Sequence, residues 1–126
     1  MLEIINNLNN DIKEILEIDN NYLSKEEVRG LIINKNKILK DNGLIEINNN
    51  VLKILIEYFS NSSFIDRSNY NEILNELINV FYSYRINLSN MVNDEEIIKY
   101  LYYNFENTCY GEIILLYDKF DLFKEG

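Results

Sequence analysis

Histidine and proline are absent from this sequence, and cysteine occurs once, as Cys109. Without histidine, neither a Cys–His nor a Ser–His catalytic pair can form, and the usual nitrogen ligand of a zinc site is missing. A single cysteine cannot close an internal disulfide, which fits a reducing cytosol. Any catalytic site would therefore be built from carboxylates and tyrosines, and any metal site would be rich in carboxylates.

Long apolar runs are also missing. The longest, "IILLY" at residues 113–117, is far shorter than the roughly 20 residues that span a bilayer. The N-terminal "MLEIINNLNN" lacks the basic segment of a secretion signal. We therefore expect a cytoplasmic protein that does not enter a membrane.

Positive charge is in deficit. The chain has 12 Lys and Arg against 21 Asp and Glu, for a net charge of −9. Residues 64–126 contain 5 basic and 11 acidic residues, so they carry −6 of this charge. A negative surface repels phosphate backbones and anionic lipids, which disfavours direct binding to nucleic acid or to a membrane surface. Proteins and cations are the expected partners.

The apolar residues recur with the period of amphipathic helices. No Pro/Gly-rich linker divides the chain, and its 126 residues suit one domain that buries about two-thirds of its unfolded surface. The sequence therefore predicts a single all-α domain over residues 1–126, a compact helical bundle of about five to six helices.

Local signals place the helix ends. The first helix is predicted at residues 2–18, and the second from Lys25, after a capping box of Ser24 and Glu27, to a left-handed Gly43. Residues 43–47, "GLIEI", are predicted to be an extended connector.

Four further helices are expected after this connector. The first begins at Val51. The second follows Ser68, its expected cap, and the third follows Asn93, with Glu96 completing a second capping pair. The fourth begins at Glu112. The stripe from Tyr70 to Tyr84 is the longest, so we expect its helix to be central.

Fifteen of the 16 tyrosines and phenylalanines follow Lys53. On a helical wheel, Tyr103 falls opposite the apolar side of its helix, and Tyr100 flanks it. An outward tyrosine is either an incidental surface residue or an interface anchor. Tyr100 and Tyr103 are therefore the candidate interaction surface, whereas Cys109 is predicted to be a small buried apolar side chain.

Arg85 lies on the apolar rather than the polar side of its helix. Its stem either crosses the edge of the core with the guanidinium in water, or it forms an ion pair with Glu46 or Asp94. We favour Glu46, because the apolar residues of "GLIEI" must turn inward and carry the acid with them. Asp94 is already used at a helix start.

Three functions stay open. The leading hypothesis is a non-enzymatic protein–protein interaction module with an unidentified partner. The second is an acidic inhibitor that mimics nucleic acid, and the third is an enzyme with a carboxylate/tyrosine or divalent-cation site in a concave pocket. No catalytic, cofactor-binding or metal-binding residue is assigned, no cofactor is expected, and self-association is left open.

Several segments together resemble a family of small bacterial proteins, chiefly from Firmicutes, known only as a domain of unknown function. The segments are "LKDNGLIEI", "LIEYFSNSSFI", "NYNEILNELINVFYSYR" and "NDEEIIKYLYYNFENTCYG", and the resemblance covers roughly residues 24–117. The matching positions are Gly43, Glu46, Phe59, Ser62, Tyr70, Phe81, Tyr82, Arg85, Asp94, Phe105, Cys109 and Gly111. Leu44 departs from the family, where a basic residue is typical. The resemblance supports one bacterial domain and implies no mechanism.

Overall fold

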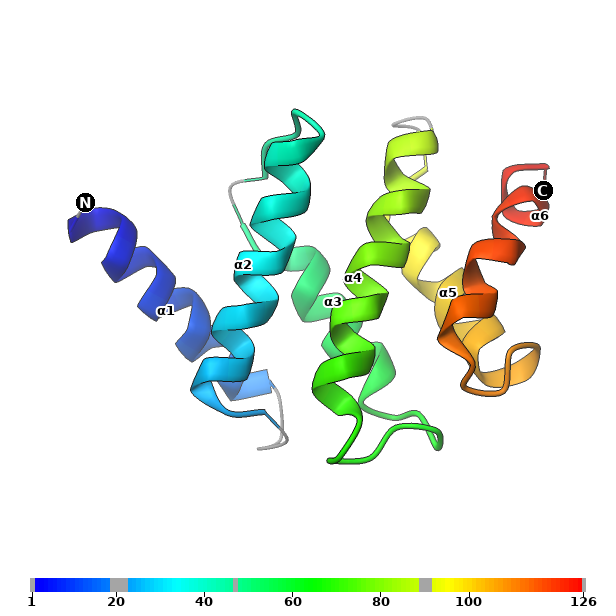
Figure 1. The fold of residues 1–126 in the computed structure, drawn as a ribbon, viewed down its shortest axis with the longest axis horizontal. Coiled ribbons are helices and arrows are strands. Elements are labelled where there is room, and N and C mark those ends of the chain that lie inside the picture. The colour runs from blue at the N-terminus through cyan, green and yellow to red at the C-terminus, as the bar shows by residue number, and fades with distance from the viewer. Residues whose placement is uncertain (1, 19–22, 47, 89–91, 126) are drawn as a thin grey trace.

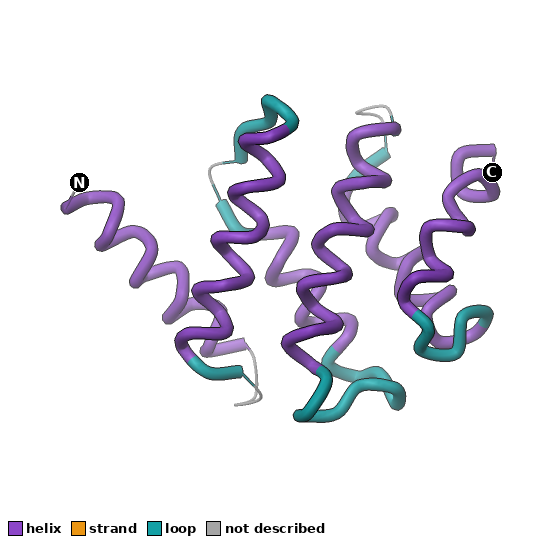
Figure 2. The backbone as a smooth tube through the Cα atoms, in the orientation of Figure 1, coloured by secondary structure: helices purple, strands orange, loops and turns teal. Residues whose placement is uncertain are grey.

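Helices make up most of the described chain, which comprises residues 2–18, 23–46, 48–88 and 92–125 of a computed structural model. Within these ranges there are six α-helices, one 3-10 helix and no strand. In Figure 2, helices are purple and no part of the described chain has the orange of a strand. The elements are α1 (Leu2–Ile18), α2 (Lys25–Asp41), α3 (Asn50–Phe59), α4 (Tyr70–Asn87), α5 (Asp94–Asn107), η1 (Ile113–Lys119) and α6 (Phe120–Glu125). The predicted all-α bundle is confirmed.

The helices form two layers (Figure 1). α2, α4 and η1 lie side by side in one layer, and α1, α3 and α5 lie behind them in the other. Helices that follow each other in the chain run in opposite directions, so the neighbours within a layer are parallel. Three helical pairs are thus stacked side by side, as in α-solenoid proteins. The sequence has no internal repeat from which this stacking could be predicted.

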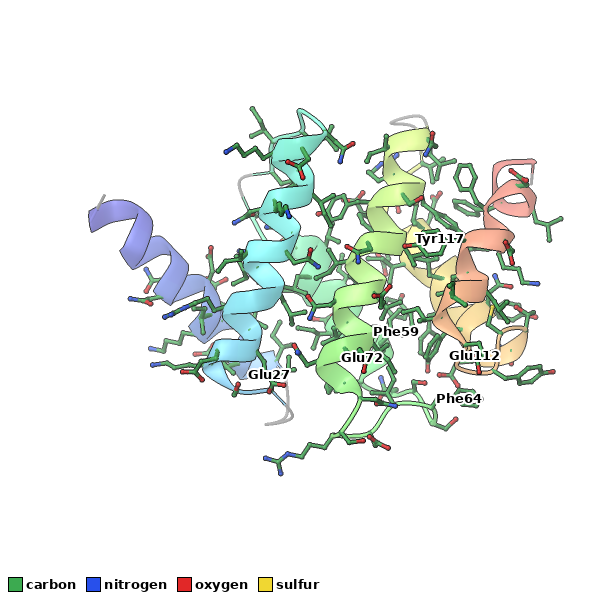
Figure 3. All side chains as sticks on the ribbon, viewed as in Figure 1. Glu27, Phe59, Phe64, Glu72, Glu112 and Tyr117 are labelled. Atoms are coloured by element: carbon green, nitrogen blue, oxygen red, sulfur yellow. The ribbon has the colours of Figure 1, made fainter. Side chains whose placement is uncertain are left out.

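α4 is the central helix, as predicted, because it packs against α2, α3, α5 and η1. Eight of its residues are buried: Tyr70, Leu74, Leu77, Ile78, Val80, Phe81, Tyr82 and Tyr84. Phe59 of α3 lies behind α4, inside the molecule (Figure 3), and its ring meets Tyr102 and Phe105 of α5 edge-on. Buried aromatic residues from α3, α4 and α5 therefore join the aliphatic side chains of the core.

The predicted capping residues of α2 and α5 are confirmed. Ser24 Oγ accepts a hydrogen bond from the Glu27 amide at 3.1 Å, and Glu27 Oε1 accepts one from the Ser24 amide at 2.9 Å. Asn93 Oδ1 accepts from the Glu96 amide at 2.8 Å. These bonds satisfy amides that have no partner within the first turn of a helix.

Two expectations are corrected. Asn69, not Ser68, occupies the N-cap position of α4, and its side chain makes no capping hydrogen bond. The amide and the hydroxyl of Ser68 both donate to Asp66 instead. The last helix is not continuous, since η1 has 3-10 geometry and passes into α6 at Phe120. Apolar periodicity alone does not distinguish these two helix types over so short a segment.

Candidate functional site

A pocket of about 310 Å³ is lined by residues near the ends of α2 and α4. These two helix ends lie at the upper edge of Figure 1. Its wall comes from the end of α2, the connector at 44–46, the end of α4 and the start of α5. The apolar lining residues are Leu39, Leu44, Ile45, Phe81, Ile86 and Leu88. The charged and phenolic ones are Glu46, Tyr82, Arg85 and Asp94. A small concave site with a few convergent polar groups is the usual form of a binding site.

The end of α2 directs the connector across this pocket. Gly43 has a φ of 66°, and the Leu44 amide donates to the Leu39 carbonyl at 2.8 Å while the Gly43 amide donates to the Lys40 carbonyl at 3.2 Å. These bonds define a Schellman motif, which reverses the chain with glycine in the left-handed conformation. The predicted role of Gly43 is confirmed, and Leu44 is thereby placed at the pocket wall beside Leu39.

Lys35 fastens the other side of the connector. Its side chain is only 2% exposed, and Nζ donates to the Asn48 carbonyl at 3.1 Å and to the buried Asn49 Oδ1. Burial lowers the pKa of Lys35, an effect that the nearby carboxylates of Glu46 and Asp11 oppose. Sequence reasoning missed this residue, although it fills the gap between Ile32 and Leu39 in the apolar stripe of α2.

Glu46 is bound by Tyr82. The Tyr82 hydroxyl donates to Glu46, lying 2.6 Å from Oε2 and 2.9 Å from Oε1. Burial, and then the adjacent Glu46 carboxylate, raises the pKa of Tyr82 far above its ordinary value. The phenol therefore stays protonated and holds the carboxylate at the pocket wall.

The predicted pair of Arg85 with Glu46 is wrong. Arg85 Nη1 lies 3.0 Å from Asp94 Oδ1 and donates to the Val92 carbonyl at 2.7 Å. Arg85 and Tyr82 are three residues apart on one face of α4, so both side chains reach the pocket. Tyr82 binds Glu46, and Arg85 pairs with Asp94, which is nine residues further along the chain.

The tyrosine was the missing element of this prediction. Tyr82 is among the positions that match the family pattern, and the sequence alone gives it no role. Its spacing to Arg85 was the signal that could have paired it with a carboxylate.

A family model for a family of unknown function, DUF6323, matches residues 5–125. The chain belongs to DUF6323. The resemblance to such a family is thus confirmed and extends beyond residues 24–117. No curated protein and no solved structure matches this DUF6323 chain.

The two candidate tyrosines have different environments in this DUF6323 protein. Tyr103 is 61% exposed. Tyr100 is half-buried, with its ring stacked on Phe123 at a centroid distance of 4.5 Å and its hydroxyl donating to the Lys119 carbonyl at 2.7 Å. Tyr100 therefore secures the C-terminal segment, and Tyr103 alone of the two presents its ring to solvent.

Three further findings concern the cysteine, metal ligands and membrane spans. Cys109 is buried, as predicted. In the part of the chain that the structure describes, no three His, Cys, Asp or Glu side chains are grouped so that they could hold a metal ion. No helix there has the length and apolar character needed to cross a membrane.

Proposed function

We propose that this DUF6323 protein is a protein-interaction module that receives a segment of a partner protein in the α2–α4 pocket. The observation that carries the proposal is the exposure of Ile45, a pocket-lining residue whose side chain is 89% accessible. Leu44 and Ile86, which also line the pocket, are exposed as well. Exposed apolar residues gathered around a concavity are typical of interaction sites.

The setting of this activity is part of the proposal. We take the chain to act as one domain in the cytosol of a bacterium of the Firmicutes type. The single buried cysteine and the acidic composition support the cytosolic setting. The family resemblance supports the bacterial one.

A second candidate is a small-molecule enzyme, because the pocket unites a tyrosine with two carboxylates. Tyr82 weighs against it. A general acid or base works best with a pKa near the working pH, whereas burial raises the pKa of Tyr82 well above its usual range. A phenol that stays protonated is suited to positioning Glu46, and we therefore prefer binding to catalysis.

A random peptide library displayed on phage tests the proposal. Selection against the wild-type protein should enrich peptides that no longer bind Ile45→Ser, which removes the exposed apolar side chain at the pocket. Ile33→Ser is the matched control, because Ile33 is also exposed, at 54%, but lies on α2 and does not line the pocket. Its peptide affinity should equal that of the wild type.

The exposed Tyr103 on α5 is the alternative binding surface. The variant Tyr103→Ser distinguishes binding at this surface from binding in the pocket. Loss of binding in Tyr103→Ser with full binding in Ile45→Ser would move the interaction site to α5 and refute the pocket. Equal binding by all three variants would show that the selected peptides recognise neither surface.

A further inference from the structure

We infer that the side chain received by the α2–α4 pocket is a lysine or arginine of the partner protein, bound by the carboxylate of Glu46. The inference rests on the proposed function and names the chemistry of the partner. It is carried by the hydrogen-bonding capacity of Glu46, by the charges around the pocket and by the apolar walls.

Glu46 has capacity for a ligand. A carboxylate offers about four acceptor sites, and the single hydroxyl proton of Tyr82 serves both oxygens. Within the described residues, Tyr82 is the one hydrogen-bond donor to this carboxylate. An ammonium or guanidinium group can therefore add charge-assisted hydrogen bonds without displacing the phenol.

The surroundings favour a cation. Among the residues that line the pocket, Glu46 and Asp94 carry two negative charges against the one positive charge of Arg85, which is engaged with Asp94. Lys35 also interacts with Glu46, but it does not line the pocket, and its amine is bound to the Asn48 carbonyl and to Asn49 Oδ1. The C-cap residues of α2 and α4, Asn42 and Leu88, also line the pocket. Carbonyls at the carboxyl end of a helix carry a partial negative charge of about half a unit, so two such ends outweigh the single amino end of α5.

The shape suits a long side chain that belongs to a protein. A volume of about 310 Å³ lies at the small end of ligand sites and accommodates one lysine or arginine. The stems of these residues pack along apolar surface while the charged end meets a polar group. The exposed Ile45 and Ile86 provide contact area for the residues that flank the lysine or arginine in the partner's chain. A free amine has no such flanking residues.

The selected peptides test this inference directly. An arginine can be replaced by citrulline, which keeps the length and removes the charge, and a lysine by norleucine, which keeps the four-carbon stem and removes the ammonium group. Either replacement should weaken binding about tenfold or more, as expected for a lost charge-assisted hydrogen bond. Glu46→Gln, which keeps an acceptor for Tyr82, should weaken binding of the unmodified peptides by a similar factor. Arg85→Gln removes the positive charge from the pocket and should tighten binding.

The signs of these effects decide the matter. If Glu46→Gln tightens binding and Arg85→Gln weakens it, the pocket selects an anion and the inference is overturned. If the peptides depend on Ile45 but bind equally well without their basic residue, the inference fails while the proposed function stands. If no peptide depends on Ile45, the proposed function itself fails.

One further probe separates a protein ligand from a free amine. n-Butylammonium should bind far more weakly than the peptides, and equal affinity would overturn the assignment to a protein side chain. Urea melts establish that each variant is folded. Should Glu46→Gln not fold, the citrulline and norleucine peptides still decide the result with the wild-type protein.

Discussion

Three glycines of this chain should respond to alanine in three different ways. Gly30 lies within α2, and an added Cβ would have no heavy atom within 4 Å. Gly43 has a φ of 66° in equally open space, whereas Gly111 has a φ of 82° and an added Cβ would lie 2.8 Å from Cβ and Cγ of Phe64. The series therefore separates helix propensity, backbone conformation and steric overlap.

The expected free energies follow from these geometries. Gly30→Ala should stabilise the protein by about 0.5–1 kcal/mol, the usual gain in a helix interior. At Gly43, the left-handed conformation costs alanine about 1–2 kcal/mol, of which the lower entropy of the unfolded chain returns about 0.4–1 kcal/mol. Gly111→Ala adds overlap with Phe64, worth about 1–3 kcal/mol, and should be the most destabilising of the three.

Urea denaturation followed by far-UV circular dichroism gives the free energy of unfolding of each variant, provided that the slope with urea is unchanged. Phe64 lies at the opposite end of the molecule from the pocket, next to Glu112 (Figure 3), so peptide binding should be unaffected. In a Phe64→Gly background, which lacks both the Cβ and the ring that an added Cβ at Gly111 would meet, Gly111→Ala should cost no more than Gly43→Ala. If Gly111→Ala and Gly43→Ala have equal effects in the wild-type background, the steric reasoning is wrong.

Three other predictions concern the polar groups around the pocket. Arg85→Leu should lower the free energy of unfolding by about 1–3 kcal/mol, which is less than for a fully buried pair because Asp94 is partly exposed. Arg85→Lys should lower it by less. If urea melts place Arg85→Leu within about 0.5 kcal/mol of the wild type, this prediction is wrong. Folding raises the pKa of Tyr82 above 10.0, so the native state keeps a proton that the unfolded state loses. The free energy of unfolding should therefore fall as the pH rises past 10. In urea melts of Tyr82→Phe, this free energy should fall less steeply with pH. Folding lowers the pKa of Lys35 below 10.5, so the unfolded state binds a proton that the native state has already lost. The free energy of unfolding of the wild type, minus that of Lys35→Met, should therefore increase as the pH rises towards 10.5. A constant difference would show that burial does not perturb this amine.

The sequence by itself determined the features that depend on neighbours along the chain. The capping pairs Ser24–Glu27 and Asn93–Glu96 span three residues, and the reversal at Gly43 needs only one left-handed residue. Such signals act within a single turn, so they can be located without knowledge of the rest of the fold. The helical class follows in the same way from apolar periodicity.

Only the tertiary structure decided which polar groups meet at the pocket. Tyr82 and Glu46 are 36 residues apart, and they meet because α2 and α4 lie parallel in one layer, an arrangement that no repeat or spacing encodes. Lys35 became a buried amine for the same reason, since the connector after α2 folds back over it. Burial and charge pairing depend on every element that packs around a site, and these distant contacts are set by the assembled helices rather than by any local pattern.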